Sequence, residues 1–344
     1  MNYIKKHLKL IAMLVGLVLL VLLSSNSYFA FVGIRAIINA IAVIGIVVIS
    51  GYASQLHLGQ SAFIGIGAYV SAILMTKCGV NFWLTIPCAV VIAGLIGWLL
   101  SIPTLQLKGG SYLALVTQCF GEIIYILLLN LEPITNGAFG ILGIPAPSIG
   151  PISFVALRPY LFLCLAFLAV VYFVVKRVLA SKYGRFFLAV KEAEEAAQSV
   201  GVNTRAYKMI AFVLATAVAG VAGVLYGPYI GYLSPEQFRW SASLQLVGMA
   251  IVGGFGSVEG GILGAVLLTV LPELLRATDQ LRMILYGVVI ILTLAFLPDG
   301  LISLFGKSWK EIKTMIVNRT HELSGKSQRK QRAREIKKSE VSTK

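Results

Sequence analysis

Charged residues are scarce in this chain of 344 residues: they make up 12% of the sequence, whereas 58% of the residues are hydrophobic. Because a soluble domain carries roughly twice that share of charge, the composition excludes a water-soluble enzyme. Cysteine is scarce too, and four cysteines cannot frame a disulfide-bonded secreted module of this length. We therefore expect one integral membrane protein whose solvent is largely lipid.

The residue groupings that carry metal or catalytic chemistry are missing from the sequence. His7, His57 and His321 are isolated, and the cysteines form no CxxC pair. We therefore expect neither a metal site nor a cofactor. The cysteines are Cys78, Cys88, Cys119 and Cys164.

Two short motifs resemble enzyme signatures but lack a required glycine. Residues 59–61 read Gly-Gln-Ser, yet Phe63 stands where a nucleophile elbow has its second glycine. Gly-Lys-Ser occurs at 306–308 and at 325–327, but Leu301 and Thr320 replace the earlier glycine of a phosphate loop. The chain is therefore expected to have no nucleotide site of its own and not to be an enzyme.

The basic residues fall into three clusters, which orient the chain in the membrane. Of 29 Lys and Arg, three lie in residues 5–9, seven in 176–208 and twelve in 307–344. Basic residues next to membrane spans gather on the cytoplasmic side, so all three clusters are expected there. This placement argues for a lipid bilayer as the partner of the basic residues and against nucleic acid.

Ten apolar runs satisfy this orientation, six before the basic loop 176–208 and four after it. The sequence therefore predicts an all-α, polytopic transmembrane helix bundle of about ten spans with both termini cytoplasmic. Residues 1–306 form the predicted transmembrane domain, and 307–344 are predicted to form a flexible basic tail. The runs are 8–30, 31–50, 58–76, 83–102, 110–131, 160–175, 209–232, 241–254, 260–275 and 283–299.

Two details of this topology stay open in the sequence. The pair of runs that flanks Gly253-Gly254-Phe255-Gly256 is either two spans or one re-entrant hairpin buried in protein. The first run follows Lys5, Lys6 and Lys9 and could be a cleaved signal peptide, although an A-x-A cleavage pattern is missing.

The loop 176–208 contains apolar residues at helical spacing, which predicts a short amphipathic helix over 186–200. Gly201 can adopt the left-handed conformation that ends a helix, and Asn203 or Thr204 can cap the next one. The apolar positions are Phe186, Val190, Ala193, Ala197 and Val200.

Part of this loop resembles the EAAxxxG element of ABC-importer permeases, which docks into a cleft of a separate ATP-hydrolysing subunit. The matching residues are Glu195, Ala196, Ala197 and Gly201. Small alanines would let the partner approach closely, the glutamate could meet a basic group, and the glycine would fix the turn. The alternative is a helix that lies on the lipid headgroups.

Several separated blocks resemble the LivM-type permeases of the branched-chain amino acid ABC importers. They are 58–69, 112–117 with 120–123, 135–137 through 143–145, 248–264 with 271–275, and 298–301, so the resemblance covers roughly residues 35–305. Members of that family carry a polar residue in the outer glycine-rich loop where Phe139 stands here, which leaves the cargo in doubt. The basic tail is not part of the shared pattern either.

The resemblance implies a transmembrane permease subunit that works by alternating access in a bacterial inner membrane. It implies as partners a related second permease subunit, two ATP-binding subunits and an extracytoplasmic substrate-binding protein, with a branched-chain amino acid as cargo. Related permeases carry urea, amides or monosaccharides, so these cargoes are the alternative. A second alternative is an ion-coupled carrier, against which the scarcity of ionisable residues in the spans argues.

Polar residues inside the apolar runs are candidates either for the translocation path or for packing between helices. Arg35 and Glu122 are the clearest ionisable residues there, with Glu273 near the end of a run. The candidate residues are Asn39, Gln60, Gln118, Glu122 and Gln245.

Overall fold

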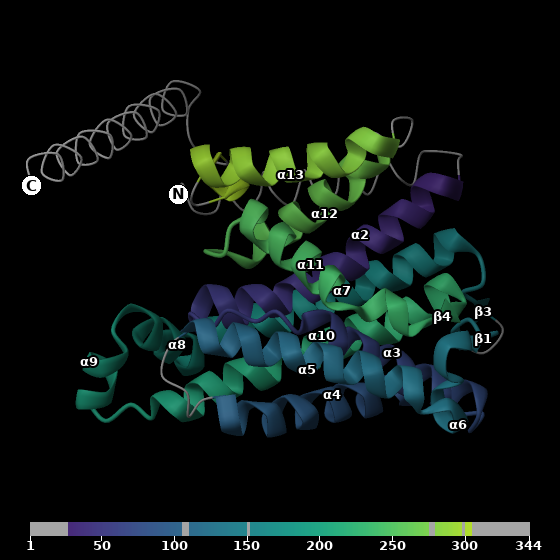
Figure 1. The fold of residues 1–344 in the computed structure, drawn as a ribbon, viewed down its shortest axis with the longest axis horizontal. Coiled ribbons are helices and arrows are strands. Elements are labelled where there is room, and N and C mark those ends of the chain that lie inside the picture. Colours follow the sequence, from purple (N-terminus) through teal and green to yellow (C-terminus); the bar gives the residue numbers. More distant parts are fainter. Residues whose placement is uncertain (1–26, 105–109, 150–151, 275–278, 298–299, 305–344) are drawn as a thin grey trace, which may run out of the picture.

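The computed structural model describes residues 27–104, 110–149, 152–274, 279–297 and 300–304, which are helical over most of their length. The main helices are α2 (Ser27–Ile46), α3 (Gln60–Thr76), α4 (Phe82–Thr104), α5 (Gly110–Asn130), α7 (Leu157–Ala180), α10 (Thr204–Ile230), α11 (Trp240–Gly253), α12 (Val258–Leu274) and α13 (Asp279–Phe296). Figure 1 shows α3, α4, α5 and α10 lying alongside one another, with α13 in a separate layer beyond α12.

The all-α membrane bundle is confirmed in its coarse form. Five described stretches are long and apolar enough to cross a bilayer. The number of ten spans stays a prediction, as does the cytoplasmic placement of both termini, because residues 1–26 and 305–344 lie outside the described part. The five stretches are Tyr28–Tyr52, Phe82–Thr104, Tyr112–Asn130, Leu157–Ala180 and Thr204–Ile230.

Helix α2 is the most enclosed of these stretches, and it ends in an unusual turn. It includes Ser27, whereas the predicted run started at residue 31. After Ile46 the chain continues as a π-helix, η1 (Val47–Tyr52). At Gly51 the backbone runs so close to the carbonyl oxygen of Phe255 that an added Cβ would lie 2.2 Å from it. Only glycine fits this contact, which joins the end of α2 to the loop between α11 and α12.

The contact between α3 and α10 is built from glycines, and we call it the glycine seam (Gly67, Gly220 and Gly223). A Cβ on Gly67 would lie 2.4 Å from the Gly220 carbonyl oxygen, and one on Gly223 would lie 2.1 Å from the Ile64 carbonyl oxygen. Small residues let helix backbones approach closely in lipid, where no hydrophobic force drives helices together. The seam therefore holds α3 and α10 together as one block.

Helices α11 and α12 form an antiparallel pair around the Gly253-Gly256 turn. A Cβ on Gly253 would lie 2.0 Å from the Gly260 carbonyl oxygen, and one on Gly264 would lie 2.0 Å from that of Met249. At 14 residues, α11 is shorter than the roughly 20 residues of a straight span. The pair is therefore two closely packed helices, and the number of crossings that it makes stays open.

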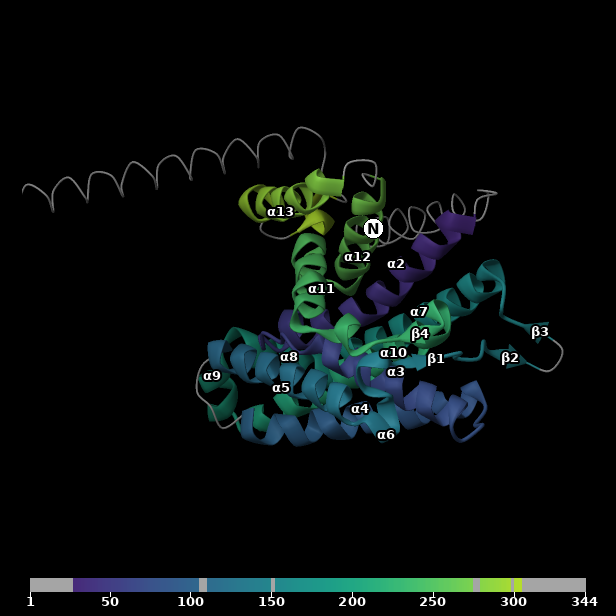
Figure 2. The same ribbon diagram turned by 45° about the vertical axis from the view of Figure 1, so that its right-hand side comes forward.

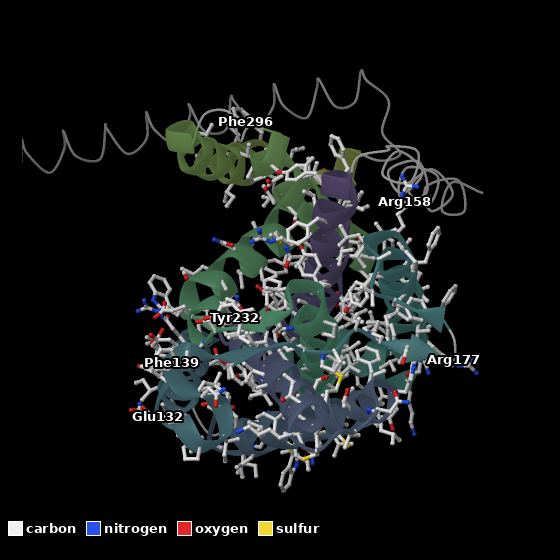
Figure 3. All side chains as sticks on the ribbon, turned by 90° about the vertical axis from the view of Figure 1, so that its right-hand side faces the viewer. Glu132, Phe139, Arg158, Arg177, Tyr232 and Phe296 are labelled. Carbon is white, nitrogen blue, oxygen red and sulfur yellow. The ribbon has the colours of Figure 1, made fainter. Side chains whose placement is uncertain are left out.

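The two ends of the bundle differ. Helices α8 (Lys182–Glu192) and α9 (Glu194–Ser199) lie at one end, which we call the α9 end (Figure 1). The opposite end, which we call the strand end, carries the short helix α6 (Glu132–Thr135) and four short strands (Figure 1). There β1 (Ile141–Leu142) pairs antiparallel with β4 (Tyr232–Leu233), and β2 (Ser148–Ile149) pairs antiparallel with β3 (Ile152–Ser153). Phe139 lies at the strand end and is 86% exposed (Figure 3).

Candidate functional site

The basic loop folds into two helices, so the prediction of one helix over 186–200 was wrong. Helix α8 ends at Glu192, Ala193 is extended with φ −153°, and α9 starts at Glu194. A continuous helix of that length would run for about 22 Å and carry its end away from Thr204, where α10 begins. The break at Ala193 lets α9 turn back to the start of α10.

The buried face of α8 and α9 is partly the predicted one. Val190 and Ala197 are buried as expected, but Phe187 rather than Phe186 is the fully buried aromatic side chain. Phe187 packs with Ala53, which follows η1, and with Ala211 of α10. Val200, predicted to lie on the apolar face, is 78% exposed because it follows the end of α9.

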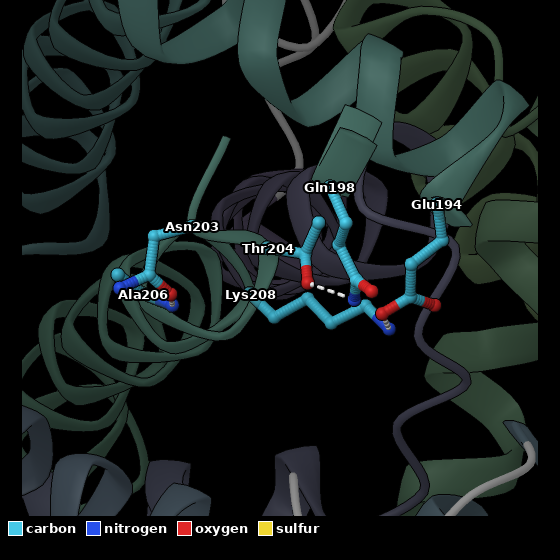
Figure 4. Close-up of polar contacts among 6 residues, drawn as sticks. All are labelled: Glu194, Gln198, Asn203, Thr204, Ala206 and Lys208. Atoms are coloured by element: carbon cyan, nitrogen blue, oxygen red, sulfur yellow. Dashed lines mark hydrogen bonds and ion pairs between the residues drawn. The ribbon is translucent and has the colours of Figure 1, made fainter. Parts of the chain in front are cut away.

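Polar contacts fix α9 to the first turns of α10 (Figure 4). Gln198 Nε2 donates to Thr204 Oγ1 at 2.9 Å, and Lys208 Nζ lies 2.6 Å from Glu194 Oε1. Gly201 has φ +83°, and Asn203 Oδ1 accepts a hydrogen bond from the backbone N–H of Ala206 at 3.1 Å. The predicted turn at Gly201 and the predicted cap at Asn203 are therefore both present.

These contacts leave the other side of α9 uncovered. Glu195 and Ala196 are exposed, whereas Ala197 is buried. The four residues of the EAAxxxG resemblance thus divide into an exposed pair, one buried alanine that anchors the helix, and a glycine that sets the turn.

Two further polar links join helices of the bundle, and one of them starts from α8. Lys191 Nζ of α8 donates to the Gly51 carbonyl oxygen of η1 at 2.7 Å. On α7, Lys176 forms an ion pair with the buried carboxylate of Glu259 at the start of α12, which also accepts a hydrogen bond from the Tyr172 hydroxyl at 2.8 Å. Movement of α8 would therefore reach α2 directly.

A cavity of about 840 Å³ lies between α2, α3, α10, α11, α12 and α13. Its volume is within the usual range of small-molecule sites. Figure 2 shows α11 and α12 beside α2, and these three helices all contribute residues to the cavity wall. The polar lining residues include Arg35, Asn39, Tyr226, Gln245, Thr269 and Glu273, and the apolar ones include Ile38, Ile64, Leu246, Met249 and Leu268.

Only two of the five polar candidates line this cavity, Asn39 and Gln245. The Nδ2 of Asn39 donates to Thr269 Oγ1 at 3.0 Å, which ties α2 to α12. Gln60 is fully buried and its Nε2 donates to the Ala42 carbonyl oxygen at 2.9 Å, so it packs α3 against α2. Gln118 and Glu122 lie half-buried on α5, away from the cavity.

The sequence had marked Arg35 and Glu273 as ionisable but had not joined them to one site, and it had missed Tyr226 and Thr269. A signal in the sequence could have joined Arg35 to Asn39, because Arg35 lies four residues before it and therefore on the same helical face. Nothing local in the sequence indicates that Tyr226, Thr269 or Glu273 belongs to the same site.

Comparison with known sequences identifies the family of the chain. Residues 28–294 match the family described as "Branched-chain amino acid transport system / permease component". The chain belongs to this family. The permease LivM of Escherichia coli K12 is 36% identical over 282 residues, which covers 75% of this chain and 66% of that protein. The chain thus matches just under two thirds of the length of this LivM.

More distant relatives carry related names. The permease LivH of Salmonella typhimurium is 25% identical over 285 residues, covering 76% of this chain and 90% of LivH. A probable LivM of Methanocaldococcus jannaschii is 25% identical over 325 residues, covering 83% of this chain and 90% of that protein. No solved structure matches the chain.

Proposed function

We propose that this chain is the transmembrane permease subunit of an ATP-driven importer for branched-chain amino acids. The observation that carries the proposal is the exposed pair Glu195 and Ala196, which is presented on a short helix whose opposite side is fixed to α10 by Gln198 and Lys208. Such a helix offers a partner a firm surface, since its own contacts lie on the other side. Membership in the branched-chain amino acid permease family supports the cargo class.

The proposed assembly contains other chains that supply what this one lacks. Two ATP-binding subunits bind at the α9 end and provide the free energy, and a substrate-binding protein delivers the amino acid at the strand end. A second, related permease subunit completes the pathway; the similarity of this chain to both LivM and LivH, each named as a permease of the same kind of system, supports such a pair.

In this proposal the α9 end lies in the cytoplasm of a bacterial cell and the strand end lies outside its inner membrane. The chain crosses the membrane about ten times and both termini are cytoplasmic, with residues 1–306 as the permease domain and 307–344 as a basic tail. Closure of the ATP-binding subunits moves α9 and α8, and the bond between Lys191 and Gly51 passes that movement to α2.

Purification of the tagged, full-length chain in mild detergent tests the partner. The parent is expected to bring down an ATP-binding subunit and ATP hydrolysis activity, whereas Glu195→Arg and Gly201→Val lose both, because one reverses an exposed charge and the other strains a left-handed turn. Phe139→Trp at the strand end is the control and keeps both. Leucine uptake by this chain alone in proteoliposomes would contradict the proposal.

Thiol labelling of intact cells tests the orientation. In a variant without the four native cysteines, Val200→Cys and Phe139→Cys place exposed thiols at opposite ends of the bundle. A membrane-impermeant maleimide is expected to label the cysteine at 139 and not the one at 200. Labelling at 200 in intact cells would place the proposed ATPase surface outside the cell and overturn the proposal.

A further inference from the structure

Arg35 is the one charged residue of helix α2, which is mostly apolar. A charge within a membrane span is costly unless it faces protein or water, so the position of Arg35 calls for a reason. Within the described residues, the ion pairs are Lys176–Glu259, Lys208–Glu194 and Arg239–Glu236, and Arg35 takes part in none of them. Arg35 is exposed and lines the cavity. Among the described residues, the charge of Arg35 is therefore not paired with a carboxylate.

The groups around Arg35 suit both ends of a zwitterion. A guanidinium binds a carboxylate through two parallel N–H donors. In the same cavity wall, Asn39 uses its Nδ2 to bond Thr269, which leaves its carbonyl oxygen as an acceptor, and Glu273 contributes a carboxylate. Acceptor oxygens of this kind are the partners that an ammonium group needs.

The rest of the cavity is apolar. Ile38 lies on the same helix as Arg35, Ile64 comes from α3, and Leu246 and Met249 come from α11. Aliphatic side chains around a few placed polar groups are typical of a small-molecule site with defined orientation. A ligand with one charged end and one aliphatic end fits this division.

We propose that the cavity binds a free amino acid with an aliphatic side chain, and that Arg35 binds its α-carboxylate. The inference rests on the proposed function and adds to it the group that selects the cargo. Asn39 and Glu273 receive the ammonium group, and the aliphatic side chain lies against Ile38, Ile64, Leu246 and Met249. Urea, amides and monosaccharides have no carboxylate, so Arg35 discriminates against them.

Protection of a thiol in the cavity tests this site. Ala242 lines the cavity, so Ala242→Cys in the variant without native cysteines places a reactive group there. In the intact transporter complex, leucine is expected to slow its labelling by a small neutral maleimide, whereas leucinamide, which lacks the carboxylate, does not. Arg35→Gln raises the half-protecting leucine concentration about tenfold or more, because a charge-assisted hydrogen bond is lost, and Arg35→Lys raises it less.

The matched control is Arg239→Gln, which removes an arginine paired with Glu236 outside the cavity and leaves leucine protection unchanged. Equal protection by leucinamide, or unchanged protection in Arg35→Gln, overturns the site. So does absence of leucine protection in a parent complex that still imports leucine, and the proposed function then stands. A parent complex that holds its ATPase but imports no branched-chain amino acid overturns the proposed function itself.

Discussion

The glycine seam between α3 and α10 and the helix pair α8–α9 are held in opposite ways. In the seam, backbone lies on backbone, and no room remains even for one methyl group at Gly67 or Gly223. Helix α9 rests on one buried alanine and a few polar side-chain bonds. The seam is therefore a rigid block, whereas α9 is the surface to which a partner would bind. We expect a movement of α9 to be passed to the α3–α10 block through only a few side-chain contacts.

The largest effect is expected from a change that breaks the block. In Gly223→Ala the new methyl group would lie 2.1 Å from the Ile64 carbonyl oxygen, so α3 and α10 must separate. We expect a loss of about 3 kcal/mol or more of unfolding free energy, seen as a lower melting temperature in detergent. Gly121→Ala is the control, since nothing lies within 4 Å of its added Cβ. Equal melting of the two variants would show that the seam is not rigid.

The second prediction concerns the link between α7 and α12. Lys176→Met removes the lysine cation that pairs with the Glu259 carboxylate, a side chain that is only 4% exposed. We expect a loss of about 3 kcal/mol, the lower end for breaking a buried pair, because the Lys176 side chain is itself 33% exposed. Adding Glu259→Gln should recover part of the loss in thermal melting. No recovery would mean that Lys176 acts through packing rather than charge.

The third prediction uses pH at the junction between η1 and α3. His57 lies there fully buried, between the rings of Phe63 and Phe212 at 5.8 and 5.0 Å, and burial lowers its pKa to about 3. Because the unfolded chain takes up this proton near pH 6.5 and the folded chain does not, stability is full above 6.5 and falls toward pH 3. Between pH 7 and pH 5 we expect a loss of about 2 kcal/mol from this group.

The measurement is the melting temperature in detergent against pH, for the parent and for His57→Gln. The variant should show a flatter curve between pH 7 and pH 5 than the parent does. Parallel curves would mean that His57 takes no part in the pH dependence.

The smallest effect is expected at α9. The Lys208–Glu194 pair is partly exposed, so Glu194→Gln should change the unfolding free energy by only about 0.5 kcal/mol. The control is Glu192→Gln on the exposed surface of α8. If Glu194→Gln instead lowered the melting temperature as much as Lys176→Met, α9 would belong to the rigid block and the contrast between the two regions would fail.

The two regions also differ in how well the sequence predicted them. The turn at Gly201 and the cap at Asn203 depend on neighbours in the chain, so local rules found them. The break at Ala193 was missed because it depends on where α10 starts, and alanine itself favours a helix.

The cavity is assembled from residues far apart in the chain, so local rules could not find it. Asn39 meets Thr269 across 230 positions, and nothing in either run of sequence indicates the other. Gln60 and Asn39 are both amides within apolar runs of the sequence. In the structure, Gln60 donates a hydrogen bond to the backbone of the neighbouring helix α2, whereas Asn39 lines the cavity. Only helix packing separates the two roles.

The π-helical end of α2 limits which insertions and deletions this segment of the chain tolerates. A π turn holds one residue more than an α turn, so deleting one residue within Val47–Tyr52 would restore an ordinary helix. The residues that follow the deletion within this helix would then rotate by about 100° about the helix axis, which would carry Gly51 away from both Lys191 and Phe255. Insertions and deletions here should therefore be far less tolerated than in the loops at the strand end.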